Sequence, residues 1–360
     1  MRLPASLDLV RPHNCVLAGV AVLVGMIVTV ASRDVPVPQA LFAFIVAMMI
    51  CGGGNAINDY CDRKIDEINR PERPIPSGRL KASHALVIGR FLFMIGVLLS
   101  VQLGELCIIL VILNSLVLAF YAAELKRISL VGNLTVGYLV GSTFLFGGLA
   151  AKSAPKFQTV SIQAVGILAA MAALSTIGRE LIKDIEDMKG DKKIGLKTFP
   201  LRHGPRVAAA LAIVFIAAAI ALSPLPYLLK LFGNVYLVLV AISVLIFIWA
   251  AATVARSQKP KAAGLASLAC KVGMGIGLLA FLAGVIAYMQ IGEVEAFIFF
   301  ILLAGIIWFI IAILLCVWVY QDAKARGESG VLWLIVILIA GIIGLIIWLI
   351  VRPKKKVVGQ

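Results

Sequence analysis

The stretch PQALFAFIVAMMICGGGNAI, residues 38–57, runs directly into NDYCDRKID, residues 58–66, and this junction decides the fold. The first part carries no charged side chain over 20 residues, and a helix needs roughly 20 apolar residues to cross a bilayer. The second part carries three aspartates within nine residues. The stretch therefore predicts a membrane-spanning helix whose polar end carries an acidic cluster.

Similar apolar runs recur along the whole chain. The composition is 62% hydrophobic, whereas a soluble domain is about 45–50% apolar. Backbone polar groups need partners inside lipid, so these runs are predicted to be helices, and the alternation typical of a barrel strand is absent. The predicted spans are 15–32, 38–57, 84–103, 106–122, 131–151, 161–179, 206–229, 234–255, 267–290, 296–320 and 331–351.

The spans divide into two predicted domains. Residues 1–290 hold nine spans and the acidic clusters, and they form the predicted core domain. Residues 291–360 form a predicted membrane hairpin that turns around 321–330 and has no chemistry that we can name. The expected fold class is all-α, a polytopic membrane helix bundle of nine helices with a C-terminal two-helix hairpin.

The formal net charge of +15 does not indicate nucleic-acid binding, because Lys and Arg lie in short loops between apolar runs. Cytoplasmic loops of membrane proteins carry an excess of Lys and Arg. The loops after the second, fourth, sixth and eighth spans are the basic ones, so they are predicted to lie in the cytoplasm. The basic tail at 352–356 conflicts with eleven spans, which leaves the topology of the hairpin open.

The first acidic cluster places Asn58, Asp62 and Asp66 at intervals of four residues. Residues four apart lie on nearly the same face of a helix, so one carboxamide and two carboxylates are expected to point in one direction.

The second cluster, DIEDMKGD, follows the sixth span and places Asp184, Asp187 and Asp191 on one helical face. Both clusters follow even-numbered spans, so both are predicted at the same side of the membrane. Magnesium prefers oxygen ligands and commonly pairs one or two carboxylates with substrate phosphates, so the two clusters together predict a site for a magnesium-bound diphosphate. Two other interpretations stay open: solvated loops balanced by nearby bases, and the ion path of a transporter.

The two motifs, NxxxDxxxD at 58–66 and DxxDxxxD at 184–191, resemble the signature of the UbiA superfamily of intramembrane prenyltransferases. The resemblance covers the nine-span core. It implies nine helices around a central cavity that opens laterally to lipid, with magnesium bound through a prenyl diphosphate.

The resemblance also implies roles for individual residues. It implies magnesium ligands at Asp62, Asp66, Asp187 and Asp191, and these, with Lys126, are the expected catalytic residues. The expected substrate-binding residues are Asn14, Asn58, Arg63, Tyr121 and Asp184.

The stretches INRPERPIPSGR (68–79) and GRELIKDIED (178–187) are similar to the archaeal branch of the superfamily that makes ether lipids. This similarity implies transfer of a geranylgeranyl group from geranylgeranyl diphosphate to geranylgeranylglyceryl phosphate. Cationic contacts to the acceptor's phosphate are then expected from Arg70, Arg73, Arg79 and Lys183. An aromatic acceptor leading to a quinone, chlorophyll or haem precursor is the alternative reaction, and a transporter or scaffold is the alternative class. The oligomeric state is left open.

Overall fold

The computed structural model of the protein describes residues 4–30, 36–154, 162–193, 195–288, 319–320, 322–323 and 326–353. The chain divides into two compact units, Met1–Gln290 and Ile291–Gln360. Each unit is described by itself below.

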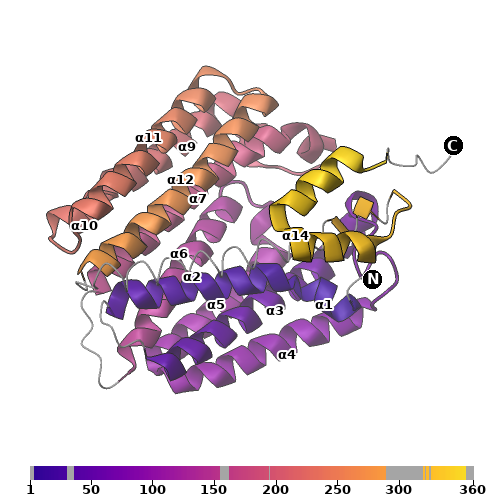
Figure 1. The fold of residues 1–360 in the computed structure, drawn as a ribbon, viewed down its shortest axis with the longest axis horizontal. Helices are drawn as coiled ribbons and strands as arrows, with labels where there is room; N and C mark the ends of the chain where they lie inside the picture. Colours follow the sequence, from indigo (N-terminus) through magenta and orange to yellow (C-terminus); the bar gives the residue numbers. More distant parts are fainter. Residues whose placement is uncertain are drawn as a thin grey trace. The chain divides into compact units, whose positions relative to one another are not determined.

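The first unit is built from helices (Figure 1). Among the residues described, nine helices are long and apolar enough to cross a membrane, which confirms the predicted all-α membrane bundle. The helices are α1 Ala5–Val10, α2 Pro12–Val30, α3 Val37–Asn69, α4 Ala82–Ser100, α5 Glu105–Ala123, α6 Val131–Lys152, α7 Ile162–Lys193, α8 Phe199–His203, α9 Pro205–Leu222, α10 Leu225–Leu228, α11 Asn234–Arg256 and α12 Pro260–Tyr288.

Two helices are much longer than the spans predicted from hydropathy. The predicted spans end at Ile57 and Arg179, but α3 continues to Asn69 and α7 to Lys193. With 33 and 32 residues, each helix exceeds the roughly 20 residues that a bilayer requires. Both acidic motifs therefore lie on rigid extensions of spanning helices. The ninth span also begins earlier than predicted, at Pro260 instead of residue 267.

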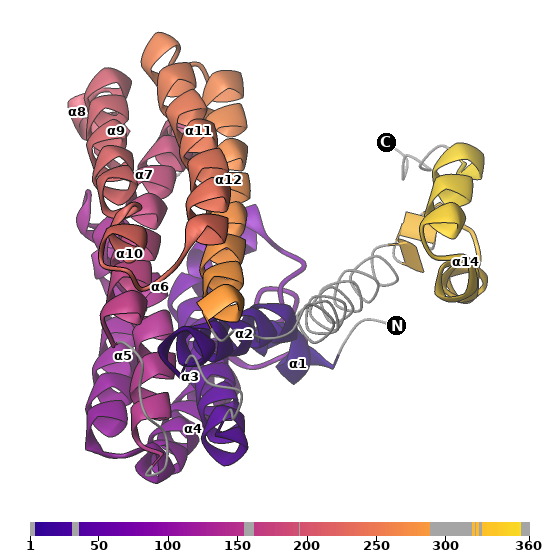
Figure 2. The ribbon, with the colours of Figure 1, turned by 60° about the vertical axis from the view of Figure 1, so that its left-hand side comes forward.

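Among the residues that the structure describes, the bundle contains two large apolar cores and a small third cluster of Leu9, Ala56 and Ala85. The helices α2, α3, α5 and α6 enclose one core, in which Val22, Val46 and Val111 are buried. The helices α7, α9, α11 and α12 enclose the other, which includes Ile216 and Val254. Contacts between α6 and α7 join the two groups, and α12 also touches α2. Figures 1 and 2 show α9, α11 and α12 side by side and α3, α4 and α5 grouped together.

The helices α2 and α6 approach each other especially closely. A Cβ atom added at Gly147 would lie 1.9 Å from the backbone oxygen of Val22, and one at Gly25 would lie 2.1 Å from that of Phe144. Small residues at helix contacts are common in membranes because they let backbones pack tightly. These two glycines therefore set the distance between α2 and α6.

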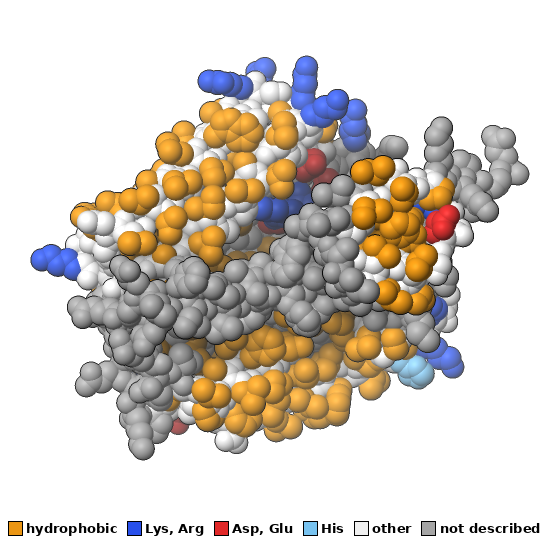
Figure 3. Space-filling view, viewed as in Figure 1, with side chains coloured by type: hydrophobic (Ala, Val, Ile, Leu, Met, Phe, Trp, Pro, Cys, Tyr) orange, Lys and Arg blue, Asp and Glu red, His pale blue; other side chains and the backbone are white. Residues whose placement is uncertain are grey.

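Large hydrophobic side chains cover the outer flanks of the helices (Figure 3). Leu98, Ile109, Val238 and Leu245 are each more than half exposed. Such an apolar surface is expected where lipid, and not water, is the solvent.

In the second unit, α14 spans Gly330–Val351. Ser329 caps it by accepting a hydrogen bond from the backbone N–H of Leu332. Asp322 accepts hydrogen bonds from Arg326 at 2.9 Å and from the Trp348 indole at 3.2 Å, so it ties the turn to α14. Most of the predicted span at 296–320 lies outside the described residues.

Candidate active site

The polar end of α3 carries a compact hydrogen-bonded group. The Lys126 ammonium donates to Asp62 Oδ1 at 2.6 Å and to Asn58 Oδ1 at 3.0 Å. Asn58 in turn donates to Asp62 Oδ2 at 2.9 Å. Asn58 and Asp62 therefore share one helical face, as their spacing indicates. Lys126 reaches them from a short 3-10 turn, Leu125–Arg127, that links α5 to α6.

Lys126 also lines a polar cavity of about 90 Å³ that reaches the second motif, and we call this space the Lys126 cavity. Its other polar lining residues include Tyr121, Asn133, Glu180 and Asp184. Asn133 donates a hydrogen bond to Asp184 Oδ2 at 2.9 Å. The cavity is therefore lined directly by Asp184 of the second motif, and Lys126 connects it to Asp62 of the first motif.

The outer part of the second motif lies farther out on α7. Asp187 is exposed and Asp191 is half-buried, and neither belongs to the lining of the Lys126 cavity. Asp191 interacts electrostatically with Asp187 and with Lys183. Of the three aspartates of this motif, only Asp184 lines the Lys126 cavity.

Asp66 turns away from the Lys126 cavity. Its buried carboxylate accepts a hydrogen bond from Arg73, which also donates to Asp59 Oδ1 at 3.2 Å. Arg11 forms a second ion pair with Asp59. These groups border a second polar cavity of about 450 Å³, the Arg11 cavity, whose lining residues are Asp8, Arg11, His13, Asn14, Asp59, Arg70, Glu72, Arg73 and Pro74. The predicted residues Asn14, Arg70 and Arg73 lie here, apart from Asp184.

The remaining predicted cations have different surroundings. Arg79 pairs with Asp8 at 2.6 Å and holds the loop after α3 against α1. Arg63 donates to the backbone oxygen of Tyr60 at 2.8 Å and lies over the Tyr60 ring. Lys183 is exposed on α7.

Sequence reasoning missed Asn133, Glu180 and Arg11 as site neighbours. Glu180 follows Arg179, with which it forms an ion pair, and a charged pair at the end of an apolar run is a signal that could have found it. Asn133 and Arg11 give no such signal, because only tertiary packing places them beside an aspartate.

An apolar cavity of about 220 Å³ lies beneath the first motif, and we call it the α3–α6 cavity. It is lined by Val46, Ala47 and Cys51 of α3, Leu118 of α5 and residues of α2 and α6. Val136 belongs to the lining of both this cavity and the Lys126 cavity. A ligand with a polar head in the Lys126 cavity therefore has an apolar space next to it.

The carboxylates present suit magnesium bound together with a phosphate ligand. Within the described ranges, no group of three or more His, Cys, Asp or Glu side chains is arranged to hold a metal ion. Magnesium commonly takes only one or two protein carboxylates and completes its shell with water and substrate phosphates. The donor set of the two motifs consists of oxygen ligands, which fits that mode of binding.

Comparison with known proteins agrees with this arrangement. Residues 18–269 match the model of the UbiA prenyltransferase family. The chain is 40% identical over 290 residues to the digeranylgeranylglyceryl phosphate synthase of Methanosarcina mazei, covering 78% of this chain and 97% of the relative. A solved structure of digeranylgeranylglyceryl phosphate synthase matches with a TM-score of 0.72 and 37% identity, over 79% of this chain and 99% of that one. A UbiA homologue from Archaeoglobus fulgidus, bound to DMAPP and Mg²⁺, shares the fold at a TM-score of 0.59 and 17% identity, over 80% of this chain and 99% of that one.

The helix bundle and its paired acidic motifs define a membrane-embedded transferase of prenyl groups. The chain belongs to the UbiA prenyltransferase family. It is an enzyme, and the transporter and scaffold alternatives are thereby set aside.

Proposed function

We propose that the protein transfers a geranylgeranyl group from geranylgeranyl diphosphate to geranylgeranylglyceryl phosphate, in a magnesium-dependent reaction that forms the second ether bond of archaeal membrane lipids. The observation that carries this proposal is the Lys126 cavity, at which Lys126, bound to Asp62 of the first motif, faces Asp184 of the second. The similarity to digeranylgeranylglyceryl phosphate synthases supports the choice of donor and acceptor.

The diphosphate of the donor would bind between the motifs. Asp62, Asp66, Asp187 and Asp191 would hold the magnesium, as the family resemblance implies, and Arg73 would have to release Asp66 for this. Magnesium, when bound, neutralises charge that develops on the departing diphosphate. Lys126 would donate to a phosphate oxygen, because a charge-assisted bond from an ammonium stabilises an anion strongly. The magnesium-bound Archaeoglobus fulgidus homologue supports use of this metal.

Two features of the cavity would favour ionisation of the donor. Lys126 and Asn58 are already held by hydrogen bonds, so little reorganisation is needed when charge appears on the leaving group. The adjoining α3–α6 cavity has an apolar wall, which would shield an allylic cation from water.

The acceptor hydroxyl would then attack the allylic carbon. The bond from that carbon to the diphosphate oxygen breaks, an ether bond forms, and the hydroxyl proton passes to a base. Glu180 lines the Lys126 cavity and pairs with Arg179, and we propose that it takes that proton. Of the cations expected to contact the acceptor's phosphate, Arg73 and Arg79 are held by carboxylates. Arg70 and Lys183 are exposed, and we assign the contact to them.

The site is proposed to face the cytoplasm. Basic side chains gather in the loops at the end of the bundle that carries both motifs, and such loops lie on the cytoplasmic side.

The test uses purified protein, geranylgeranyl diphosphate and geranylgeranylglyceryl phosphate, with identification of the product. We expect Asp62→Asn and Asp187→Asn each to lower turnover by about 100-fold or more, because the diphosphate loses an interaction that grows during ionisation. Glu105→Gln is the matched control, since this exposed carboxylate lies at the opposite end of α5 from Tyr121. Removal of magnesium by EDTA should stop turnover, and added magnesium should restore it.

Near-normal turnover in both aspartate variants would refute the metal site. Transfer to an aromatic acceptor, with none to geranylgeranylglyceryl phosphate, would refute the proposed reaction and favour the aromatic alternative.

A further inference from the structure

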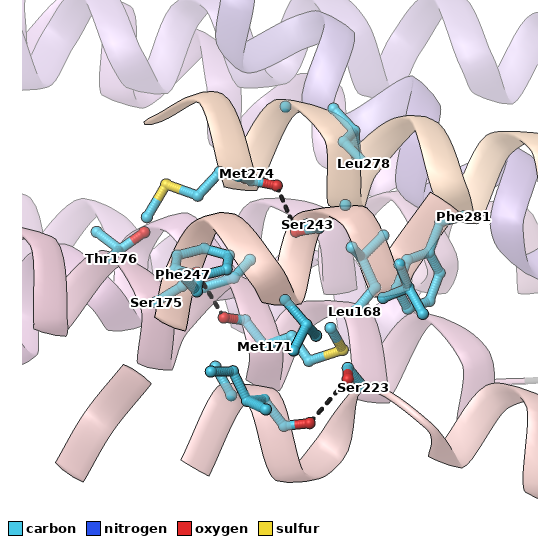
Figure 4. Close-up of a pocket in the computed structure, with 18 of the residues that line it drawn as sticks. Leu168, Met171, Ser175, Thr176, Ser223, Ser243, Phe247, Met274, Leu278 and Phe281 are labelled. Carbon is cyan, nitrogen blue, oxygen red and sulfur yellow. Dashed lines mark hydrogen bonds between the residues drawn. The ribbon is translucent and has the colours of Figure 1, made fainter. Parts of the chain in front are cut away.

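The bundle contains a second apolar cavity, on the other group of helices (Figure 4). This α7–α12 cavity has a volume of about 210 Å³ and is lined by residues of α6, α7, α9, α11 and α12 and by Ser223, which follows α9. It is close in size to the α3–α6 cavity, at about 220 Å³. Val140 of α6 lines both cavities, so α6 separates them.

The wall of the α7–α12 cavity suits a hydrocarbon ligand. Three serine hydroxyls line it, but each donates to a backbone carbonyl: Ser175 to Met171, Ser223 to Ile220 and Ser243 to Gly273, all at 2.7 Å (Figure 4). A serine that bonds to the backbone in this way no longer offers its proton to a ligand. Leu168, Phe247 and Phe281 supply apolar surface between the serines.

Both apolar cavities lie below the same polar end of the bundle. Cys51, in the α3–α6 cavity, precedes Asn58 by seven residues on α3. Ser175, in the α7–α12 cavity, precedes Asp184 by nine residues on α7. At 1.5 Å per residue these steps are about 10 and 13 Å. Chains could therefore extend from one polar site into both cavities.

The proposed reaction brings two lipids together, and their chains begin at different distances from the reacting atoms. The reacting carbon of the donor is the first atom of its own chain, so the donor's chain must start in the Lys126 cavity itself. The α3–α6 cavity shares Val136 with the Lys126 cavity and meets that condition. In the acceptor, the chain begins several bonds away from the reacting hydroxyl. The α7–α12 cavity has no lining residue in common with the Lys126 cavity, which suits a chain that begins farther away.

We propose that the α7–α12 cavity is the binding site for the hydrocarbon chain of the acceptor lipid, while the α3–α6 cavity holds the chain of the prenyl diphosphate. This inference rests on the proposed function, because it assumes that the acceptor carries a long prenyl chain.

The test fills one cavity at a time with the same substitution. Ala172 lines the α7–α12 cavity and Ala47 lines the α3–α6 cavity. We expect Ala172→Phe to raise the KM for geranylgeranylglyceryl phosphate by about tenfold or more, as overpacking of a filled site predicts. The KM for geranylgeranyl diphosphate should stay unchanged. Ala47→Phe should show the reverse pattern.

A shortened acceptor gives a second readout. With an acceptor that carries two isoprene units in place of four, Ala172→Phe should have the same KM as the unmodified protein. Gly277→Leu fills the cavity from α12, where an added Cβ meets only Ser243 Oγ, at 3.4 Å, and should reproduce the effect if Ala172→Phe fails to fold.

The outcomes separate the two proposals. If the unmodified protein transfers nothing to geranylgeranylglyceryl phosphate, the proposed function fails and the inference with it. If transfer occurs but Ala172→Phe and Gly277→Leu leave the acceptor's KM unchanged, or change the donor's instead, only the cavity assignment is overturned.

Discussion

Arg73 forms ion pairs with two buried aspartates at the polar end of α3. Its guanidinium bonds to Asp66 and Asp59, whose side chains are only 7% and 4% exposed. Removing one partner of a buried pair leaves a charge without compensation, which costs about 3–5 kcal/mol. We expect Arg73→Ala to lower the free energy of unfolding in detergent by about that amount, less the part that Arg11 compensates at Asp59.

Arg79 provides the matched control for this prediction. It lies in the same loop as Arg73 and also pairs with an aspartate, Asp8 of α1. The Asp8 side chain is 41% exposed, and exposed pairs contribute about 1 kcal/mol or less. Equal losses of stability in Arg79→Ala and Arg73→Ala would show that the burial of Asp59 and Asp66 does not determine the loss of stability.

At this scale the sequence predicts contacts along one helix and misses contacts between helices. The spacing of Asn58 and Asp62 places them together, and their hydrogen bond is present at 2.9 Å. Lys126 joins them from 64 residues away, and the family resemblance, not the spacing, pointed to it. Nothing in the spacing shows that Asp66 is held by Arg73, because the path of the loop after α3 decides which cation it meets.

Glycines at their contact allow the helices α2 and α6 to pack closely. Gly147 faces the backbone of α2, with an added Cβ only 1.9 Å from Val22 O. We expect Gly147→Ala to separate the two helices and cost about 1–3 kcal/mol of stability, as overpacking does. A thermal unfolding midpoint measured in detergent would show this as a clear decrease.

Gly166 of α7 is the control for Gly147. An added Cβ there meets no atom within 4 Å, and alanine is the better helix former by about 1 kcal/mol. Gly166→Ala should therefore leave the midpoint unchanged or raise it slightly. A decrease of equal size in both variants would mean that loss of glycine itself, and not the close approach, is responsible.

Hydropathy predicted the apolar spans, but not where the helices α3 and α7 end. A run of apolar residues marks contact with lipid, so the spans near α4, α5, α6 and α11 differ from the helices by only a few residues. The α3 and α7 helices continue into polar sequence because backbone hydrogen bonding does not stop at the edge of the lipid. These continuations carry the acidic motifs outside the apolar spans.

At the scale of the whole molecule, the alignment with the relative from Methanosarcina mazei includes 78% of this chain and 97% of the relative. The family match ends at residue 269, and the Lys126, α3–α6 and α7–α12 cavities are lined by residues of the first unit. These observations support the prediction that residues 1–290 carry catalysis, which stays a prediction until it is tested.

A chain that ends at Gln290 tests this prediction. We expect it to insert into the membrane and to transfer prenyl groups with a turnover close to that of the full chain, because a unit with its own core folds alone. Asp322→Asn in the full chain is the companion variant, since it weakens the bonds from Arg326 and Trp348 and leaves the sequence of the first unit unchanged. If the shortened chain elutes as a folded protein but lacks activity, and Asp322→Asn is also impaired, the hairpin contributes to catalysis and the nine-helix unit is not sufficient.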